Sequence, residues 1–165
     1  KNLEGIVDVY LPDFKYTDTT YAKRYSNAPD YFDVTKAALA EMVRQHPAPQ
    51  FADKQEAAVR GIEEGIMTGG VIVRHLMLPG LLKDTKAVIR YLYETYGDSI
   101  YISIMNQYTP LPQVADIEAL NRTVTPEEYD RVLRFAERIG IERGFRQEGT
   151  AASESFIPEF DERGL

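Results

Sequence analysis

Charged side chains lie in or just after apolar runs that read as strands. Asp13 and Lys15 follow one such run, and Arg74 lies inside the run 70–78, where six of nine residues are Val, Ile, Leu or Met. An arginine keeps its proton, so burying it costs several kcal/mol unless an anion or several acceptors meet it. Its planar fork suits a carboxylate. The sequence therefore predicts either a carboxylate ligand at Arg74 or an ion pair with a nearby acid, Asp13 or Glu148.

Asp13 and Lys15 are two residues apart, so a strand would place both side chains on the same side. At a strand tip this pair could meet a zwitterion or a metal-bridged carboxylate, with Lys15 supplying the positive charge. The alternative is an exposed ion pair in a turn, which contributes under about 1 kcal/mol.

His75 falls on the face of its strand opposite Arg74, and we predict a core histidine whose hydrogen bonds are satisfied. With His46 as the only other histidine, and with no cysteine, a histidine-based or thiolate metal site has no ligands in this chain. Glu127 and Glu128 are predicted to be solvated helix charges.

The polar residues of a third run also alternate. Ser103, Met105 and Gln107 alternate along the sequence with isoleucines at 100, 102 and 104. In a strand the isoleucines would face the helices, and the other three residues would line a pocket or meet solvent. Tyr108 begins a loop braced by Pro110 and Pro112, and this loop is expected to cover the site.

These residues sit on an alternating pattern of strands and helices. Helices are expected at about 17–26, 31–46, 84–96 and from the Thr125 cap to Gly140, and residues 50–69 read as a short helix or a poor strand. The helix at 31–46 shows an apolar stripe of Val34, Ala37, Ala38, Met42 and Val43. Strands are expected at 6–11, 70–78, 100–105 and 145–147.

The β-α-β-α-β-α-β order predicts an α/β fold with about four parallel strands and flanking helices, either a partial (half) TIM-type barrel or a small open sheet. In both architectures the chemistry gathers at the carboxyl ends of the strands. The chain opens almost directly on a strand pattern, which predicts that residues 1–165 are one fragment of a larger domain.

The composition of the chain limits the classes of partner that it could bind. The chain has 165 residues and a net charge of -7, which argues against a nucleic-acid groove or an anionic membrane surface. No apolar run approaches the roughly 20 residues that span a bilayer. With no cysteine to form disulfides and no signal-peptide pattern, we expect a cytoplasmic protein.

Four segments of the chain, Asp13–Tyr16, Val73–Gly80, Ser103–Pro110 and Phe156–Asp161, together resemble one family. They are similar to the pyruvate formate-lyase activating enzyme-like proteins of the radical S-adenosylmethionine (SAM) superfamily. The Arg-His-Leu-Met-Leu-Pro-Gly segment at 74–80 is the most specific, and the match covers nearly the whole chain in the order of the family's C-terminal half. The family's CxxxCxxC motif, which binds three irons of a [4Fe–4S] cluster, is missing here and is expected upstream.

The resemblance implies roles for individual residues. Asp13 and Lys15 would lie beside the methionyl part of SAM, and Asp13 with the Phe14 main chain would help to hold a monovalent cation. Arg74 and Leu76 would lie near the carboxylate and adenosine portions. Gln107 or Tyr108 occupies the place of a histidine close to SAM in the activating enzymes.

The resemblance also implies an enzyme that cleaves SAM reductively to a 5′-deoxyadenosyl radical and abstracts hydrogen from a glycyl-radical partner or a related peptide or small substrate. Its partners would be the protein's own N-terminal half and an electron donor such as flavodoxin or ferredoxin, and the segment alone is expected to be inactive. Two alternatives stay open: a cluster-free aldolase-type lyase with Lys15 as the Schiff-base amine, and a non-enzymatic domain that binds a partner.

Overall fold

The fold is α/β, as the sequence predicts. The structure is a computed structural model that describes residues 2–146. Four strands form a parallel sheet in the order β1-β3-β4-β5, and the short β2 pairs antiparallel with β3. The strands are β1 (Val9–Tyr10), β2 (Gln50–Phe51), β3 (Met67–Leu76), β4 (Tyr101–Met105) and β5 (Gly144–Arg146).

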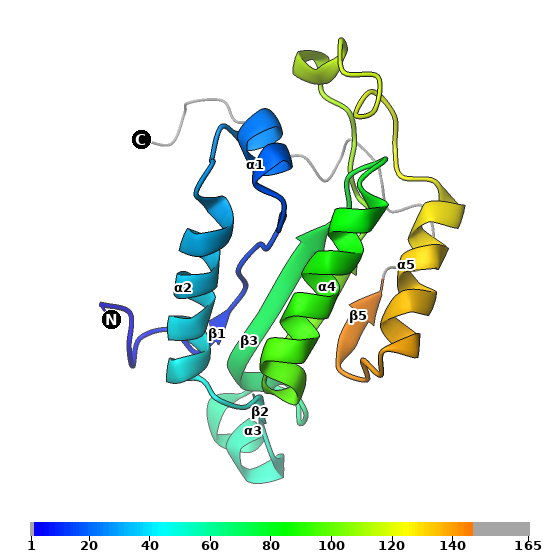
Figure 1. Cartoon of the computed structure of the whole chain (residues 1–165). Coiled ribbons are helices and arrows are strands. Elements are labelled where there is room, and N and C mark those ends of the chain that lie inside the picture. Colours follow the sequence, from blue (N-terminus) through cyan, green and yellow to red (C-terminus); the bar gives the residue numbers. More distant parts are fainter. Residues whose placement is uncertain (1, 147–165) are drawn as a thin grey trace.

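The main helices cover one side of this sheet (Figure 1). They alternate with the strands along the chain, as right-handed crossovers between parallel strands require. The helices are α1 (Thr19–Ser26), α2 (Tyr31–Gln45), α3 (Lys54–Arg60), α4 (Leu82–Tyr96) and α5 (Pro126–Arg138), with short 3₁₀ turns at Gly97–Ser99 and Pro112–Val114.

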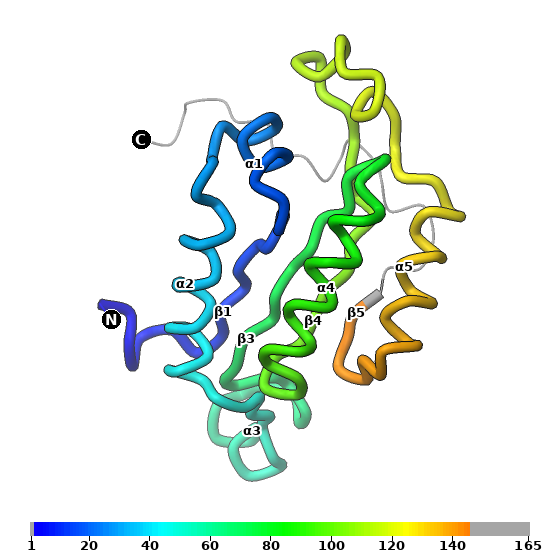
Figure 2. Tube along the Cα trace, in the orientation of Figure 1, coloured from blue at the N-terminus to red at the C-terminus, as the bar shows by residue number. Residues whose placement is uncertain are grey.

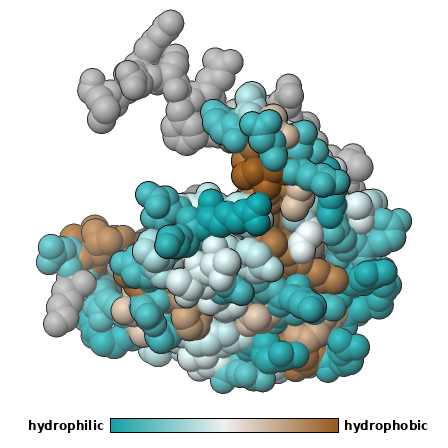
Figure 3. Space-filling view, turned by 45° about the horizontal axis from the view of Figure 1, so that its top comes forward, coloured by the Kyte–Doolittle hydropathy of each residue, from teal (hydrophilic) through white to brown (hydrophobic). Residues whose placement is uncertain are grey.

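The core lies between the sheet and the helices. Val71, Val73, Ile102 and Ile104 from the strands are 0–4% exposed, and they pack with apolar residues of α4 and α5 such as Val132. The helix-bearing side of the molecule is mostly hydrophilic on its outside, with hydrophobic residues visible in scattered patches (Figure 3). The sheet therefore has one dry face, packed against amphipathic helices.

The helix boundaries follow local signals. Asp18 accepts a hydrogen bond from the Thr20 N–H and caps α1, and Thr125 and Glu128 form a complete capping box at the start of α5. Both starts were predicted from the sequence, and both are confirmed.

The inner face of α2 differs from the predicted stripe. Val34 is 58% exposed, and Ala37 and Ala38 are exposed too, whereas Leu39 is 1% exposed and Met42 is half-buried. The prediction was wrong for Val34, Ala37 and Ala38 and is confirmed for Met42 and Val43, which pack against the core. Alanine fits either face of a helix, so the large side chains decide which face is buried.

The first strand is shorter than predicted. Residues 2–6 form turns, Ile6 is 72% exposed, and regular pairing covers only Val9 and Tyr10. The chain nevertheless stays beside β3, because Arg74 N–H donates to Pro12 O and Phe14 N–H donates to Arg74 O, both at 2.8 Å. Pro12 has no N–H of its own to add to this ladder.

Residues 47–66 form an arm below the sheet, built from β2 and α3 (Figure 2). From the sequence, this stretch was predicted to form either a short helix or a poor strand. In the structure it contains one helix and one strand. At the opposite end of the molecule, the loop that follows β4 rises above the carboxyl ends of the strands (Figure 2). In the described part of the chain, no helix is long and apolar enough to cross a membrane.

Candidate functional site

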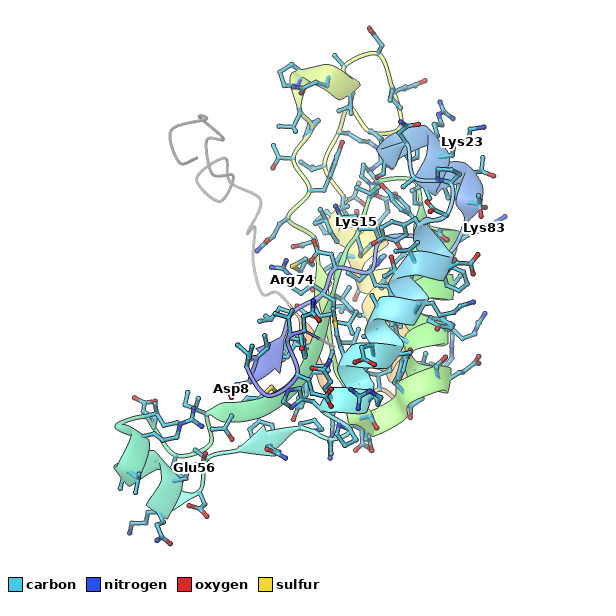
Figure 4. The ribbon with its side chains drawn as sticks, turned by 90° about the vertical axis from the view of Figure 1, so that its left-hand side faces the viewer. Asp8, Lys15, Lys23, Glu56, Arg74 and Lys83 are labelled. Carbon is cyan, nitrogen blue, oxygen red and sulfur yellow. The ribbon has the colours of Figure 1, made fainter. Side chains whose placement is uncertain are left out.

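Arg74 lies on the face of the sheet that the helices leave uncovered. Along β3, burial alternates: Val73 and His75 are fully buried on the helix side, while Arg74 and Leu76 are half-buried. Figure 4 shows α2 and α4 on one side of β3 and labels Arg74 on the other. The alternation of a strand thus delivers the charged residue to the face without helices.

Arg74 forms an ion pair with Asp13. The two residues face each other in an isolated parallel bridge, and both Arg74 Nη2 and Nε approach Asp13 Oδ1, at 2.7 Å and 2.8 Å. The predicted pairing of Arg74 with a neighbouring acid is confirmed for Asp13; Glu148, the other candidate, lies outside the described residues.

The ion pair remains accessible to solvent. The side chains of Arg74 and Asp13 are 43% and 41% exposed, so the pair contributes little net stability on its own. It uses one carboxylate oxygen and two of the five guanidinium N–H donors. The remaining polar atoms are the ones that could meet a small charged ligand.

Leu76 and Lys15 extend this site toward the carboxyl ends of the strands. Leu76 ends β3 on the same face as Arg74 and lies opposite Met105 of β4. Lys15 follows Asp13 by two residues and is half-buried. In Figure 4 it is labelled above Arg74, toward the carboxyl end of β3. Asp13, Arg74, Leu76 and Lys15 are called the strand-tip site below.

Gln107 and Tyr108 lie just beyond β4 at the same end of the sheet. Gln107 is half-buried. The Tyr108 hydroxyl donates to Leu120 O at 2.9 Å, and burial raises its pKa. Tyr108 therefore anchors the far side of its own loop, a role that its position before a Pro-rich stretch did not indicate.

His75 is a core histidine, as predicted. It is 1% exposed, with Nδ1 2.8 Å from Phe14 O and Nε2 3.1 Å from Thr85 Oγ1. Burial is the largest effect on its pKa, which lies below the usual value, so the ring is neutral near pH 7.

Two residues that the sequence did not single out also hold this region. Tyr31 contacts the backbone on both sides of Phe14: its hydroxyl donates to Asp13 O at 3.2 Å and accepts from Lys15 N–H at 2.9 Å. Asp84, 5% exposed, accepts from the backbone N–H groups of Thr17 and Asp18 at 3.1 Å and 3.0 Å. These contacts join residues far apart in the sequence, so no local pattern could have revealed them.

Glu128 is not a solvated charge, so that prediction was wrong, although its neighbour Glu127 is exposed as expected. Arg122 donates to both oxygens of Glu128, at 2.7 Å and 2.9 Å, and Gly80 N–H donates at 3.2 Å. The Arg122 hydrogen bonds, aided by backbone N–H groups, lower the pKa of Glu128 to about 2. Glu128 thus ties the start of α5 to the turn that follows β3.

One cavity lies away from the strand-tip site. A hollow of about 310 Å³ lies between α5 and the β4–β5 edge, on the helix side of the sheet, and its walls combine apolar side chains such as Ile104 with Glu137 and Glu142. It contains none of the strand-tip residues. Within residues 2–146, no three His, Asp or Glu side chains come together to hold a metal ion.

One curated protein is similar to this chain. Over 140 residues, 85% of the chain, the sequence is 29% identical to "Uncharacterized protein MJ0674" of Methanocaldococcus jannaschii. The match covers 34% of that protein, so the chain spans about a third of the length of this relative. No protein-family model matches the chain.

Proposed function

We propose that this chain is the C-terminal part of a radical SAM enzyme resembling pyruvate formate-lyase activating enzyme, and that it supplies residues that bind SAM. The observation that carries the proposal is the Asp13–Arg74 pair, held on the helix-free face of a parallel sheet. Carboxyl ends of parallel strands are where α/β folds bind their ligands. The segment 74–80, which carries the most specific part of the family resemblance, contributes Arg74 and Leu76 to the same site.

The strand-tip site suits the charges of SAM. The methionyl carboxylate would accept hydrogen bonds from Arg74 and Lys15, and the ammonium and sulfonium groups would lie near Asp13. Leu76 offers an apolar surface beside these charges. The exposure of the Asp13–Arg74 pair supports this assignment, because both groups remain within reach of a ligand.

The iron–sulfur cluster does not fit this chain alone, because the sequence contains no cysteine. In radical SAM enzymes the cluster supplies the electron that cleaves SAM to the 5′-deoxyadenosyl radical. The proposal therefore assigns the cluster ligands to the N-terminal half of a longer protein. This segment binds and orients SAM. The substrate in this proposal is a glycyl-radical enzyme or a related peptide or small molecule. The electron donor is a flavodoxin- or ferredoxin-type protein.

The test is SAM affinity in the complete, cluster-loaded protein, measured by isothermal titration calorimetry. Arg74→Ala and Lys15→Ala are each expected to weaken binding by about 1–3 kcal/mol, roughly 5- to 150-fold, through loss of charge-assisted hydrogen bonds.

Arg60→Ala is the matched control. Arg60 is 42% exposed, like Arg74, and it also pairs with an aspartate of the first segment, Asp8, but at the arm end of the sheet. Its loss removes the same charge and a similar ion pair, so SAM affinity should stay at the wild-type value.

Unchanged affinity in both site variants would remove the assignment of the site. If SAM does not bind and borohydride traps a carbonyl compound on Lys15, the aldolase-type lyase replaces the radical SAM proposal. If neither ligand binds and a stable protein partner is recovered whose binding survives Arg74→Ala, the non-enzymatic alternative replaces it.

A further inference from the structure

The backbone of Asp13-Phe14-Lys15 is held at each of its central polar groups. Phe14 N–H donates to Arg74 O, and the Tyr31 hydroxyl bridges Asp13 O and Lys15 N–H. The Phe14 side chain is 1% exposed among the aromatic rings of α2 and α4. A rotation of this tripeptide would therefore break hydrogen bonds and pull Phe14 from the core.

The remaining group, Phe14 O, is held by His75. A carbonyl oxygen can only accept, so Nδ1 of His75 must carry the proton, and the unprotonated Nε2 then accepts from the Thr85 hydroxyl. His75 and Thr85 are 1% and 2% exposed, so no water competes for these bonds. The chain of contacts runs from α4 through the imidazole to the backbone between Asp13 and Lys15.

The first turn of α4 also holds the residues that follow. Asp84, next to Thr85, accepts from Thr17 N–H, the Thr17 hydroxyl and Asp18 N–H. Helix α4 thus holds Phe14 through His75, and Thr17 and Asp18 through Asp84. Helix α2 holds the neighbouring Asp13 and Lys15 through Tyr31.

We infer that Tyr31, His75 and Thr85 are positioning residues that preset Asp13 and Lys15 for their ligand. This inference rests on the proposed SAM site and extends it, because Tyr31 and His75 bond the backbone of the site and Thr85 bonds His75. A site whose charged groups are fixed before binding loses less conformational entropy when the ligand arrives. Tyr31 and His75 hold the two ends of one peptide unit, the Lys15 N–H and the Phe14 carbonyl oxygen.

The first test needs no ligand. Nitrogen-15 NMR of the wild-type chain should show His75 protonated on Nδ1. In Tyr31→Phe and in Thr85→Val, the Lys15 amide should exchange its hydrogen roughly tenfold faster than in wild type, and Thr85→Ser should restore the wild-type rate.

Two matched variants control for a general destabilisation of the fold, which would also speed amide exchange. Tyr93→Phe removes another tyrosine hydroxyl that donates to a backbone carbonyl, that of Gly140, and Ile89→Val trims a fully buried α4 residue. Both should leave Lys15 exchange unchanged. A proton on Nε2 of His75, or equal exchange in Tyr31→Phe, Thr85→Val and these controls, would overturn the inference.

The second test uses SAM and the complete, cluster-loaded protein. Tyr31→Phe should weaken SAM binding about 5- to 10-fold, and this effect should shrink when Lys15 is already alanine, because the part that acts through the Lys15 side chain is then lost while the part that acts through Asp13 remains. Wild-type protein that does not bind SAM would overturn the proposed function. Tight SAM binding that is equal in wild type, Tyr31→Phe and Thr85→Val would overturn the positioning role alone.

Discussion

At the scale of single residues, the sequence indicated which side chains carry charge to the strand ends but not what holds them. Arg74 stood out because a permanent cation in an apolar run needs a partner, and Asp13 is that partner. Tyr31 and Asp84 gave no such signal. Tyrosine and aspartate are ordinary residues near helix starts, and their partners lie 16 and 67 residues away.

Glu128 illustrates the same limit and gives a prediction. Its capping role was visible in Thr125-Pro-Glu-Glu, but its bonds to Arg122 and Gly80 were not. Because its pKa falls from an ordinary 4.5 to about 2 on folding, Glu128 stabilises the native state above about pH 4.5, and this contribution disappears as the pH falls toward 2.

Glu128→Gln should therefore lower the free energy of unfolding at pH 7 by about 1–2 kcal/mol, and the difference from wild type should shrink between pH 4.5 and pH 2.5. Urea denaturation at a series of pH values checks this. Glu127→Gln is the control, since Glu127 is exposed, and it should stay within about 0.5 kcal/mol of wild type at every pH. A pH-independent loss in Glu128→Gln would contradict the ionic explanation.

At the scale of elements, the spacing of apolar residues predicted whether a segment forms a helix or a strand. It was less successful at predicting which face of that element is buried. The strands β3, β4 and β5 and the helices α1, α4 and α5 lie where the apolar patterns and caps placed them, within a few residues. The failures are short or alanine-rich: the first strand shrinks to Val9–Tyr10, and α2 buries Leu39 instead of Val34. In both cases tertiary packing chooses among local options that the sequence leaves nearly equal in energy.

The join between the arm and β3 depends on one glycine. Gly70 has a φ of +147°, and an added Cβ would lie 3.3 Å from Met67 Sδ and 3.3 Å from the Pro49 backbone. Gly70→Ala should therefore cost about 1–3 kcal/mol of unfolding free energy in urea denaturation. Nearby Gly69→Ala places its Cβ 2.9 Å from the amide oxygen of Gln50, the end of a flexible side chain that can move, so it should cost clearly less. Equal losses in both variants would show that backbone strain at Gly70 is not the cause.

At the scale of the whole molecule, the structure has the two layers that were predicted, a parallel sheet and the helices that flank it. Helices pack on one face of the sheet, and the other face carries half-buried or exposed residues of mixed polarity, among them Arg74, Leu76 and Tyr101. Phe51 of the arm reaches this face and meets the Tyr101 ring, which stacks on Phe145. Sequence alternation predicted two unlike faces, but it could not predict that the arm would contribute to one of them.

The arm also has a consequence for how the chain would respond to a protease. Helix α3 buries only Ala57, and the segment after it, residues 61–66, is largely exposed, including Glu63 and Glu64. The parallel pairing of β1, β3 and β4 does not pass through these residues. Among the glutamates of residues 2–146, a glutamate-specific protease should cut first at Glu63 and Glu64, and the pieces on either side of this cut should still elute together on gel filtration as one nicked particle.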